Sequence, residues 1–130
     1  MPRAPKKMLS PHFSENEFRC KCGCGIVLVS KNLLGALERM RKMMGSITIK
    51  SGCRCPTWNK VVGGKRRSAH ITTEDKECLA ADIGLRSKGS RMRLKVVKAA
   101  LEVGIKRIGP HKGFVHIDVA THLPEGMWVY

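Results

Sequence analysis

The chain has 130 residues, a length that fits one domain, and 42% of them are hydrophobic, enough for a modest core. Its 25 Lys and Arg against 10 Asp and Glu give a formal net charge of +15, which favours a polyanionic partner such as an anionic cell envelope or a nucleic acid. No apolar run approaches the ~20 residues of a membrane span. No apolar segment follows the basic start, so we expect synthesis in the cytoplasm without a signal peptide.

We expect residues 1–12 to form a flexible basic arm and residues 13–130 to form a single domain. The Ser-x-x-Glu spacing at 14–17 is typical of a capping box and predicts a short helical turn. The Cys- and Gly-rich segment 20–25 is too rich in glycine for regular structure. A short strand is expected directly after it, at 26–29.

Two longer helices are predicted from apolar residues that recur with helical spacing. The first begins after Ser30, a good N-cap, and ends before Gly45. Its apolar face holds Leu33, Leu34, Leu37, Met40 and Met44. The second covers residues 90–103, with Leu94, Val97 and Leu101 on one face.

Short strands are predicted at 47–50, 80–85, 105–108 and 114–119, and a short helix at 55–62. Helices and strands are interspersed without the regular alternation of βαβ units. The sequence therefore predicts an α+β fold, with a small antiparallel sheet packed by two main helices.

The segment Phe-Val-His-Ile-Asp-Val at 114–119 alternates with period two, so Phe114, His116 and Asp118 share one face of the strand. The imidazole and the carboxylate then lie ~7 Å apart along the strand, which suits a metal ligand and a neighbour that orients it or accepts a proton. A histidine that is merely hydrogen-bonded to Asp118 explains the same pair.

Asp82 is the one charge in the small apolar run 79–83, and a buried carboxylate needs a cation or hydrogen-bond donors. A turn aspartate is the simpler alternative. Together with His70 and His116, however, Asp82 would complete a three-ligand zinc site with one open position, the arrangement of catalytic zinc. His111 is a reserve ligand.

Five motifs occur in a fixed order: Ser-Gly-Cys-Arg-Cys-Pro-Thr-Trp-Asn at 51–59, Val-Gly-Gly at 62–64, Ser-Ala-His at 68–70, Ala-Ala-Asp-Ile at 80–83 and Phe-Val-His-Ile-Asp-Val at 114–119. This ordered set resembles the zinc D-Ala-D-Ala carboxypeptidase-like peptidases. That family includes bacterial murein peptidases and phage endolysins, and its fold is shared with the hedgehog signalling domain.

The resemblance implies that His70, Asp82 and His116 are zinc ligands and that zinc-bound water is the nucleophile. It implies that Arg54 faces the substrate, where a guanidinium would stabilise the oxyanion formed at the amide. Ser68 matches a substrate-binding serine of the family.

The chain departs from the family pattern at two places. The interval from His70 to Asp82 is longer than usual, so we expect residues 71–78 to loop out and to place acidic side chains near the site. Gly113 stands where many members have an acidic residue, three positions before His116. We therefore expect Asp118 to be the general base, with a glutamate of the 71–78 segment as the competitor.

The cysteines form two tight clusters, Cys20, Cys22 and Cys24 in one and Cys53 and Cys55 in the other, while Cys78 stands alone. A structural zinc site, disulfides and free thiols all remain open, because spacing does not fix pairing or ligation. A structural zinc would tether the N-terminal segment to the loop that carries Arg54. Cys78 is also within the segment that would approach the catalytic metal.

From the sequence we therefore expect a monomeric, endolysin-like zinc peptidase that cuts an amide in peptidoglycan stem peptides. It would reach the cell wall in the periplasm by holin-type release, aided by attraction to the anionic envelope. The alternatives are a catalytically inactive family member and a basic module that binds structural zinc or nucleic acid. Aromatic residues do not alternate with the basic ones, which argues against nucleic acid.

Overall fold

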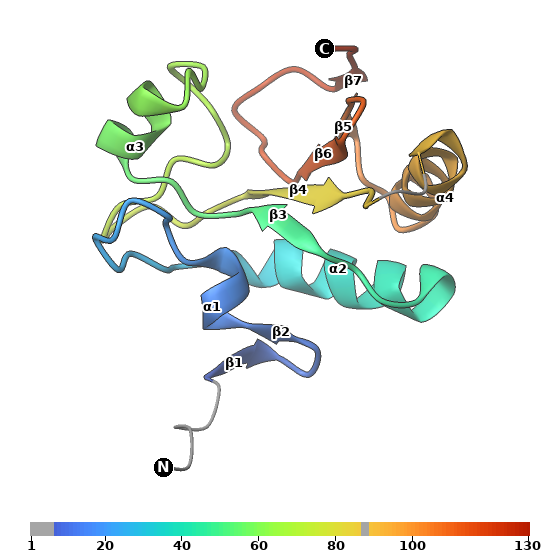
Figure 1. Cartoon of the computed structure of the whole chain (residues 1–130), viewed down its shortest axis with the longest axis horizontal. Coiled ribbons are helices and arrows are strands. Elements are labelled where there is room, and N and C mark those ends of the chain that lie inside the picture. The colour runs from blue at the N-terminus through green and yellow to red at the C-terminus, as the bar shows by residue number, and fades with distance from the viewer. Residues whose placement is uncertain (1–6, 87–88) are drawn as a thin grey trace.

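The structure, a computed structural model, describes residues 7–86 and 89–130 (Figure 1). Its strands are β1 (Met8–Ser10), β2 (Phe13–Ser14), β3 (Ile49–Ser51), β4 (Ala80–Gly84), β5 (Arg107–Pro110), β6 (Phe114–Asp118) and β7 (Gly126–Met127). Its helices are α1 (Glu15–Phe18), α2 (Lys31–Met44), α3 (Pro56–Val61) and α4 (Gly89–Glu102). The α+β prediction is confirmed.

A five-stranded sheet in the order β3-β4-β6-β5-β7 organises the fold, and β1 pairs with β2 in a separate hairpin. Pairing is antiparallel from β3 to β5, and β7 adds to β5 in parallel. In this register Asp82 lies opposite His116, and His116 lies opposite Gly109 on its other side. The three positions therefore form one row across the sheet.

The two faces of the sheet differ in character, as the period-two pattern of residues 114–119 predicts. Val115 and Ile117 of β6 join Ile83 of β4 in the hydrophobic core. Because neighbouring residues of a strand point to opposite faces, Asp82 and His116 project from the other face. The sheet thus separates the core from the polar site.

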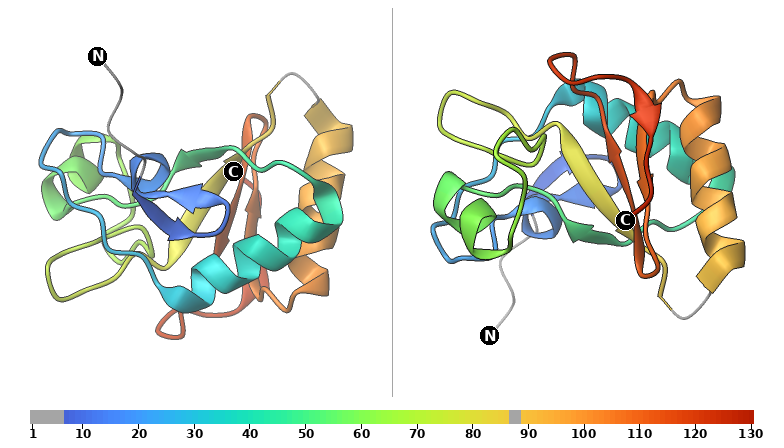
Figure 2. Two further views of the ribbon diagram at one scale, coloured as in Figure 1. Left: turned by 90° about the horizontal axis from the view of Figure 1, so that it is seen from below. Right: turned by 90° about the horizontal axis from the view of Figure 1, so that it is seen from above.

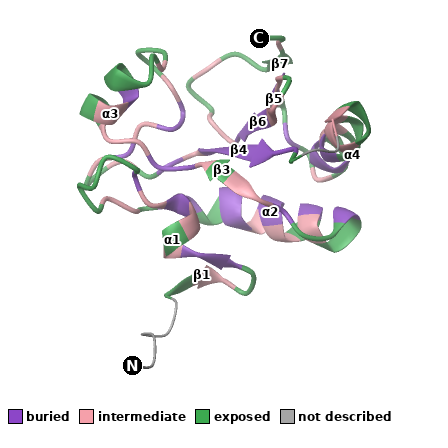
Figure 3. Ribbon diagram, viewed as in Figure 1, coloured by how far each residue is buried: buried purple, intermediate pink, exposed green. Residues whose placement is uncertain are grey.

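The helices α2 and α4 pack against each other, and α4 also contacts β5 and β6 (Figure 2). Their inward faces are buried and their outward faces are exposed (Figure 3). The limits of α2 agree with the prediction: the Ser30 hydroxyl accepts from the Leu33 amide at 3.3 Å, and Gly45 ends the helix with φ of 85°. In the described part of the chain, no helix has the length and apolar character to cross a membrane.

The apolar face predicted for α4 is wrong at two positions. Leu94 is 60% exposed and Leu101 is 55% exposed, whereas Val96, Ala99 and Ala100 are buried. The buried set also has helical spacing, so periodicity alone does not choose between the two stripes. The small alanines let the helix approach its neighbours closely.

The prediction of a flexible arm at residues 1–12 is wrong from Met8 onwards; residues 1–6 lie outside the described residues. Met8–Ser10 form β1, and the Ser10 hydroxyl and the His12 amide donate to the Glu38 carboxylate of α2 at 2.6 and 2.8 Å. The expected strand at 26–29 is also absent, since there only Val29 makes an isolated bridge, to Cys78. These partners are distant in sequence, which is why local patterns did not reveal them.

Glu38 provides a test of how the hairpin is held. Burial acts against ionisation, but hydrogen bonds from Ser10 and His12 lower the pKa of Glu38 below its ordinary 4.5. A lowered pKa means that the ionised form stabilises the fold above pH 4.5 and that this stabilisation is lost as the pH falls further. We expect Glu38→Gln to lower the free energy of unfolding in urea at pH 7 by about 1–2 kcal/mol.

The variant should also lose part of the acid dependence of stability that the native chain shows below pH 4.5. Glu102→Gln, at the exposed end of α4, is the matched control and should leave both measurements unchanged. Equal stability of Glu38→Gln and the native chain at pH 7 would contradict this role for the carboxylate.

Candidate metal centre and substrate groove

The side chains of His70, Asp82 and His116 converge on one point and are buried. His70 Nε2 lies 3.1 Å from Asp82 Oδ1 and 3.2 Å from His116 Nδ1, and the last two atoms are 3.0 Å apart. Tetrahedral zinc with ligands at 2.0–2.1 Å sets neighbouring donor atoms about 3.3 Å apart. The triangle therefore fits three ligands of a single zinc ion and leaves a fourth position open.

Asp82 and His116 are placed by the sheet, whereas His70 is placed by the loop between α3 and β4. This loop is fixed by a parallel bridge in which the Arg54 amide donates to the His70 carbonyl at 3.0 Å and the Thr72 amide donates to the Arg54 carbonyl at 2.7 Å. The Thr72 hydroxyl adds a bond to the same His70 carbonyl at 2.9 Å. The long interval before Asp82 therefore does not loosen His70.

The segment 71–78 turns away from the site. Thr73 and Lys76 exchange backbone hydrogen bonds across a tight turn. The acidic side chains Glu74, Asp75 and Glu77 are exposed and are not among the residues that line the groove described below. The expectation that they lie near the site is therefore wrong, and a glutamate of this segment has no position from which to act as the base.

The outer ring nitrogens of both histidines are held by hydrogen bonds. His70 Nδ1 lies 2.7 Å from the Gly52 carbonyl, and His116 Nε2 lies 2.7 Å from Asp118 Oδ2. A carbonyl and a carboxylate accept a ring N–H, so the opposite nitrogen of each imidazole presents its lone pair to the centre of the triangle. Such partners are typical of metal-ligating histidines.

Asp118 was expected to be the general base, and the geometry gives it a different position. One oxygen binds His116, and the other accepts from Arg107 Nε at 2.8 Å and from the Ala120 amide at 3.1 Å. The side chain is almost fully buried. Both oxygens are thus engaged behind the imidazole, which is the arrangement of a carboxylate that orients His116.

The pKa shifts of two of the three donors, His70 and Asp82, favour the forms that bind a divalent cation. Burial lowers the pKa of His70 and so favours its neutral, ligating form. Although burial opposes ionisation, hydrogen bonds from His116 and His70 hold the pKa of Asp82 well below its usual range. Burial also acts against charge on His116, but Asp118 and Asp82 together raise its pKa. A buried anionic carboxylate between two imidazoles calls for a cation.

Gly52 was not identified as a site residue from the sequence. A Cβ atom at this position would lie 2.6 Å from the ring of Phe18, so only glycine lets the strand end approach that ring while its carbonyl holds His70. Its place in the Ser-Gly-Cys-Arg motif was the available signal.

Arg54 and Ser68, the two residues that the resemblance implied for substrate contact, lie beside the three donors. The Arg54 guanidinium donates to Asp82 Oδ2 at 3.3 Å and to the Ser51 hydroxyl at 3.3 Å, and its side chain remains 16% exposed. The Ser68 hydroxyl accepts from the His70 amide at 3.2 Å. Both residues line the groove, so each has access to a bound ligand.

A groove of about 880 Å³ opens over the three donors. Aromatic rings form part of its wall: Trp58, Phe114, Trp128 and Tyr130. The Trp128 ring centroid lies 5.3 Å from that of His116, a position that requires Gly109, where a Cβ atom would come within 2.4 Å of the indole. Trp128 and Gly109 escaped the sequence reasoning because β7 joins the sheet only in three dimensions.

The groove is strongly cationic. Its basic lining residues are Lys21, Lys50, Arg54, Lys65, Arg67 and Arg107, and its acidic ones are Asp82 and Asp118. Arg54 and Arg107 are paired with these two carboxylates, whereas the remaining four cations form no ion pair with any described carboxylate. The dispersed positive charge of the sequence is thus partly gathered around one cavity, which suits an anionic ligand.

The cysteines divide differently from the sequence clusters. Cys20, Cys22, Cys24 and Cys55 form one group, with sulfurs within 4.8 Å of one another. Cys53 does not belong to this group, contrary to expectation: it is buried and its thiol interacts with that of Cys78. Cys78 donates to the Ala80 carbonyl at 3.1 Å and is not one of the donors in the histidine site.

His111 is not needed as a reserve ligand. Its ring stacks on Phe114 with centroids 4.4 Å apart, and it does not belong to the donor group that the described residues form.

The site consists of two imidazoles and one carboxylate that are fixed by buried hydrogen bonds and open toward a groove. This arrangement defines a site of the metallohydrolase class. The model of the peptidase M15 family matches residues 11–118, and the chain belongs to this family, whose peptidases are zinc-dependent. The search of curated proteins gave no match.

The role of Asp118 is testable through metal affinity. Asp118→Asn should weaken zinc binding at the histidine site about 10- to 100-fold, because the loss of a carboxylate that orients a ligating imidazole has an effect of this size. Competition with a chromophoric chelator measures it. Asp75→Asn, in the exposed turn, should bind zinc like the native chain, and unaltered affinity in Asp118→Asn would contradict the orienting role.

Proposed function

We propose that this protein is a zinc-dependent peptidase that hydrolyses an amide bond in peptidoglycan stem peptides. The observation that carries the proposal is the donor triangle of His70, Asp82 and His116, which opens into a cationic, aromatic-lined groove beside Arg54. Membership of the peptidase M15 family supports the class of reaction.

A bound zinc ion supplies Lewis acidity, which polarises a carbonyl and lowers the pKa of water. The chain supplies the geometry: Gly52 and Asp118 hold the two imidazoles, and the Arg54 guanidinium steadies the second oxygen of Asp82. Since these supports are buried or nearly so, the donors are set before a substrate arrives.

Arg54 is placed to act on the substrate as well as on Asp82. A guanidinium carries five N–H donors in a planar fork, and the contacts with Asp82, Ser51 and Asn59 leave two of them free on a side chain that lines the groove. We propose that these donors stabilise the negative charge that develops on the carbonyl oxygen of the scissile amide.

The positive charge of the groove favours a peptide that carries free carboxylates. Stem peptides are peptides of this kind. Lys50, Lys65 and Arg67 lie on the groove without a carboxylate partner among the described residues, so they attract anionic groups of the substrate. Trp128 and Tyr130 offer flat apolar surfaces to the small side chains and the peptide planes. The net charge of +15 would add attraction to an anionic cell envelope.

An endolysin-like role follows as part of the same proposal, with the protein acting as a monomer on the cell wall in the periplasm after holin-type release. A peptide substrate accounts for the groove, the Arg54 position and the histidine site together. A nucleic-acid-binding module would use the basic surface but leaves the donor triangle unexplained.

The decisive experiment is digestion of purified murein with the zinc-loaded protein, followed by mass analysis of the products. We expect soluble stem-peptide fragments whose new termini identify the bond. His116→Ala should release none, because one of the three donors is lost. Full activity in His116→Ala, or an absence of products from the zinc-loaded native protein, would overturn the proposal.

Replacement of Arg54 tests its part in the reaction. Arg54→Gln should lower kcat/KM for the hydrolysis of purified murein about 10²- to 10³-fold, since one strong donor to the developing oxyanion is removed. Arg54→Lys should recover only part of the loss, because an ammonium lacks the planar fork. Zinc content is measured alongside: loss of zinc from Arg54→Gln would show instead that the residue serves the metal site.

The cationic groove predicts an effect on substrate affinity. Lys65→Ala should raise KM several-fold with kcat nearly unchanged, and the difference from the native protein should shrink at high salt, which screens charge. Lys98→Ala removes the same charge from the exposed side of α4 and should have no such effect. Equal effects of both substitutions would show that only the net charge matters.

A further inference from the structure

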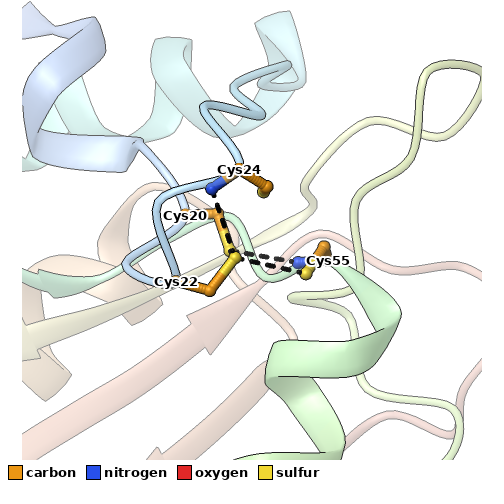
Figure 4. A group of neighbouring side chains, drawn as sticks. All are labelled: Cys20, Cys22, Cys24 and Cys55. Carbon is orange, nitrogen blue, oxygen red and sulfur yellow. Dashed lines mark hydrogen bonds between the residues drawn. The ribbon is translucent and has the colours of Figure 1, made fainter.

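We infer that the chain has a second metal site, a structural zinc ion bound by four cysteine thiolates. The ligands are Cys20, Cys22 and Cys24 in the loop after α1 and Cys55 at the N-cap of α3, and they lie together (Figure 4). This site shares no residue with the histidine site and does not rest on the proposed peptidase activity.

The spacing of the sulfurs is that of a tetrahedral site. Cys22 Sγ lies 3.5 Å from Cys20 Sγ and 3.6 Å from Cys55 Sγ, and all four sulfurs lie within 4.8 Å of one another. Zinc–sulfur bonds of 2.3 Å set tetrahedral sulfurs about 3.8 Å apart. The two short distances lie near this value, and the 4.8 Å limit gathers all four sulfurs around one centre, as a single zinc ion requires.

The geometry does not divide the cysteines into pairs. Cys22 has two sulfur neighbours at nearly equal distance, whereas a disulfide joins each sulfur to one partner at about 2.05 Å. Four ligands around one centre account for this arrangement, and two cross-links do not.

Backbone N–H groups point at three of the sulfurs. The Cys24 amide donates to Cys22 Sγ, the Cys55 amide to Cys20 Sγ and the Trp58 amide to Cys55 Sγ, each at 3.4 Å. A thiol is a poor acceptor, whereas a thiolate is an anion that such donors stabilise. The three amides would therefore donate to thiolates that bind a metal.

The loop has little else to hold its shape. Residues 21–25 are exposed and lie in turns or irregular structure, and the chain reverses between Cys20 and Ile26, whose backbone groups bond at 3.0 Å. Gly23, with φ of 93°, takes a left-handed conformation within the reversal. A segment that buries so little apolar surface needs a cross-link to stay in one conformation.

The position of the cluster connects it to the groove. Cys55 follows Arg54 directly, and Lys21, between two of the ligands, lines the groove itself. A zinc ion here would fasten the loop to the strand end that carries Gly52 and Arg54, and so hold one wall of the groove in place.

Zinc analysis of the purified protein by mass spectrometry tests the inference. We expect two zinc ions per chain, one in each group of donors. His116→Ala should retain one zinc, and an X-ray absorption spectrum of this variant should show four sulfur ligands at about 2.3 Å. Cys22→Ser should lose that shell of sulfurs and retain only the zinc at the histidines.

Cys53→Ala is the matched control, because Cys53 lies in the same segment but outside the cluster; it should keep two zinc ions. Should Cys22→Ser fail to fold, the His116→Ala spectrum still decides the matter. A His116→Ala protein that is free of zinc overturns the inference. So does a native mass lower by two hydrogens per cysteine pair, which would reveal disulfides.

A second measurement addresses the tethering role. Trypsin should cleave after Lys21 faster in Cys22→Ser than in the native protein, while cleavage after the exposed Arg66 keeps its rate. An unchanged rate after Lys21 would show that the loop is held without the ion and would overturn the tethering role.

Discussion

The cross-strand pairing of Asp82 with His116 is the constraint on which the site depends. If β6 slipped by one residue against β4, the His116 imidazole would turn into the core and an apolar neighbour such as Val115 would face the groove. The buried apolar face therefore fixes the register, and the register fixes two of the three donors. Core packing and metal-site geometry are in this sense one requirement.

The remaining parts of the site are attached to this pair from irregular segments. His70 comes from a loop, Arg54 follows the end of β3, and Trp128 follows β7. Each is held by backbone contacts: the bridge between Arg54 and Ile71, and the bond from the Trp128 amide to the Ile108 carbonyl at 3.1 Å. The proposed thiolate zinc would add a cross-link between the exposed loop 21–25 and the residue next to Arg54.

The charged residues at the site fall into two groups, buried carboxylates with partners and cations without a partner in the described part of the chain. The anionic Asp82 and Asp118 are buried between cations and imidazoles, which compensate the cost of removing them from water. The lysines and Arg67 on the groove lack this compensation among the described residues. The buried carboxylates set the geometry of the donors, and the cations of the second group produce a positive potential in the groove that favours an anionic ligand.

The sequence by itself determined much of this protein: the α+β class, the limits of α2, the alternating faces of β6 and the family. These depend on local periodicity and on motifs that lie contiguous in the chain. Tertiary structure alone decided the face that α4 buries, the placement of Met8–Ser10, the orienting position of Asp118, and which cysteines meet. Each of these depends on partners far apart in sequence: Glu38 for the hairpin, Arg107 for Asp118 and Cys55 for the cysteine loop. Local spacing carries no information about such partners, because only the folded chain brings them within bonding distance.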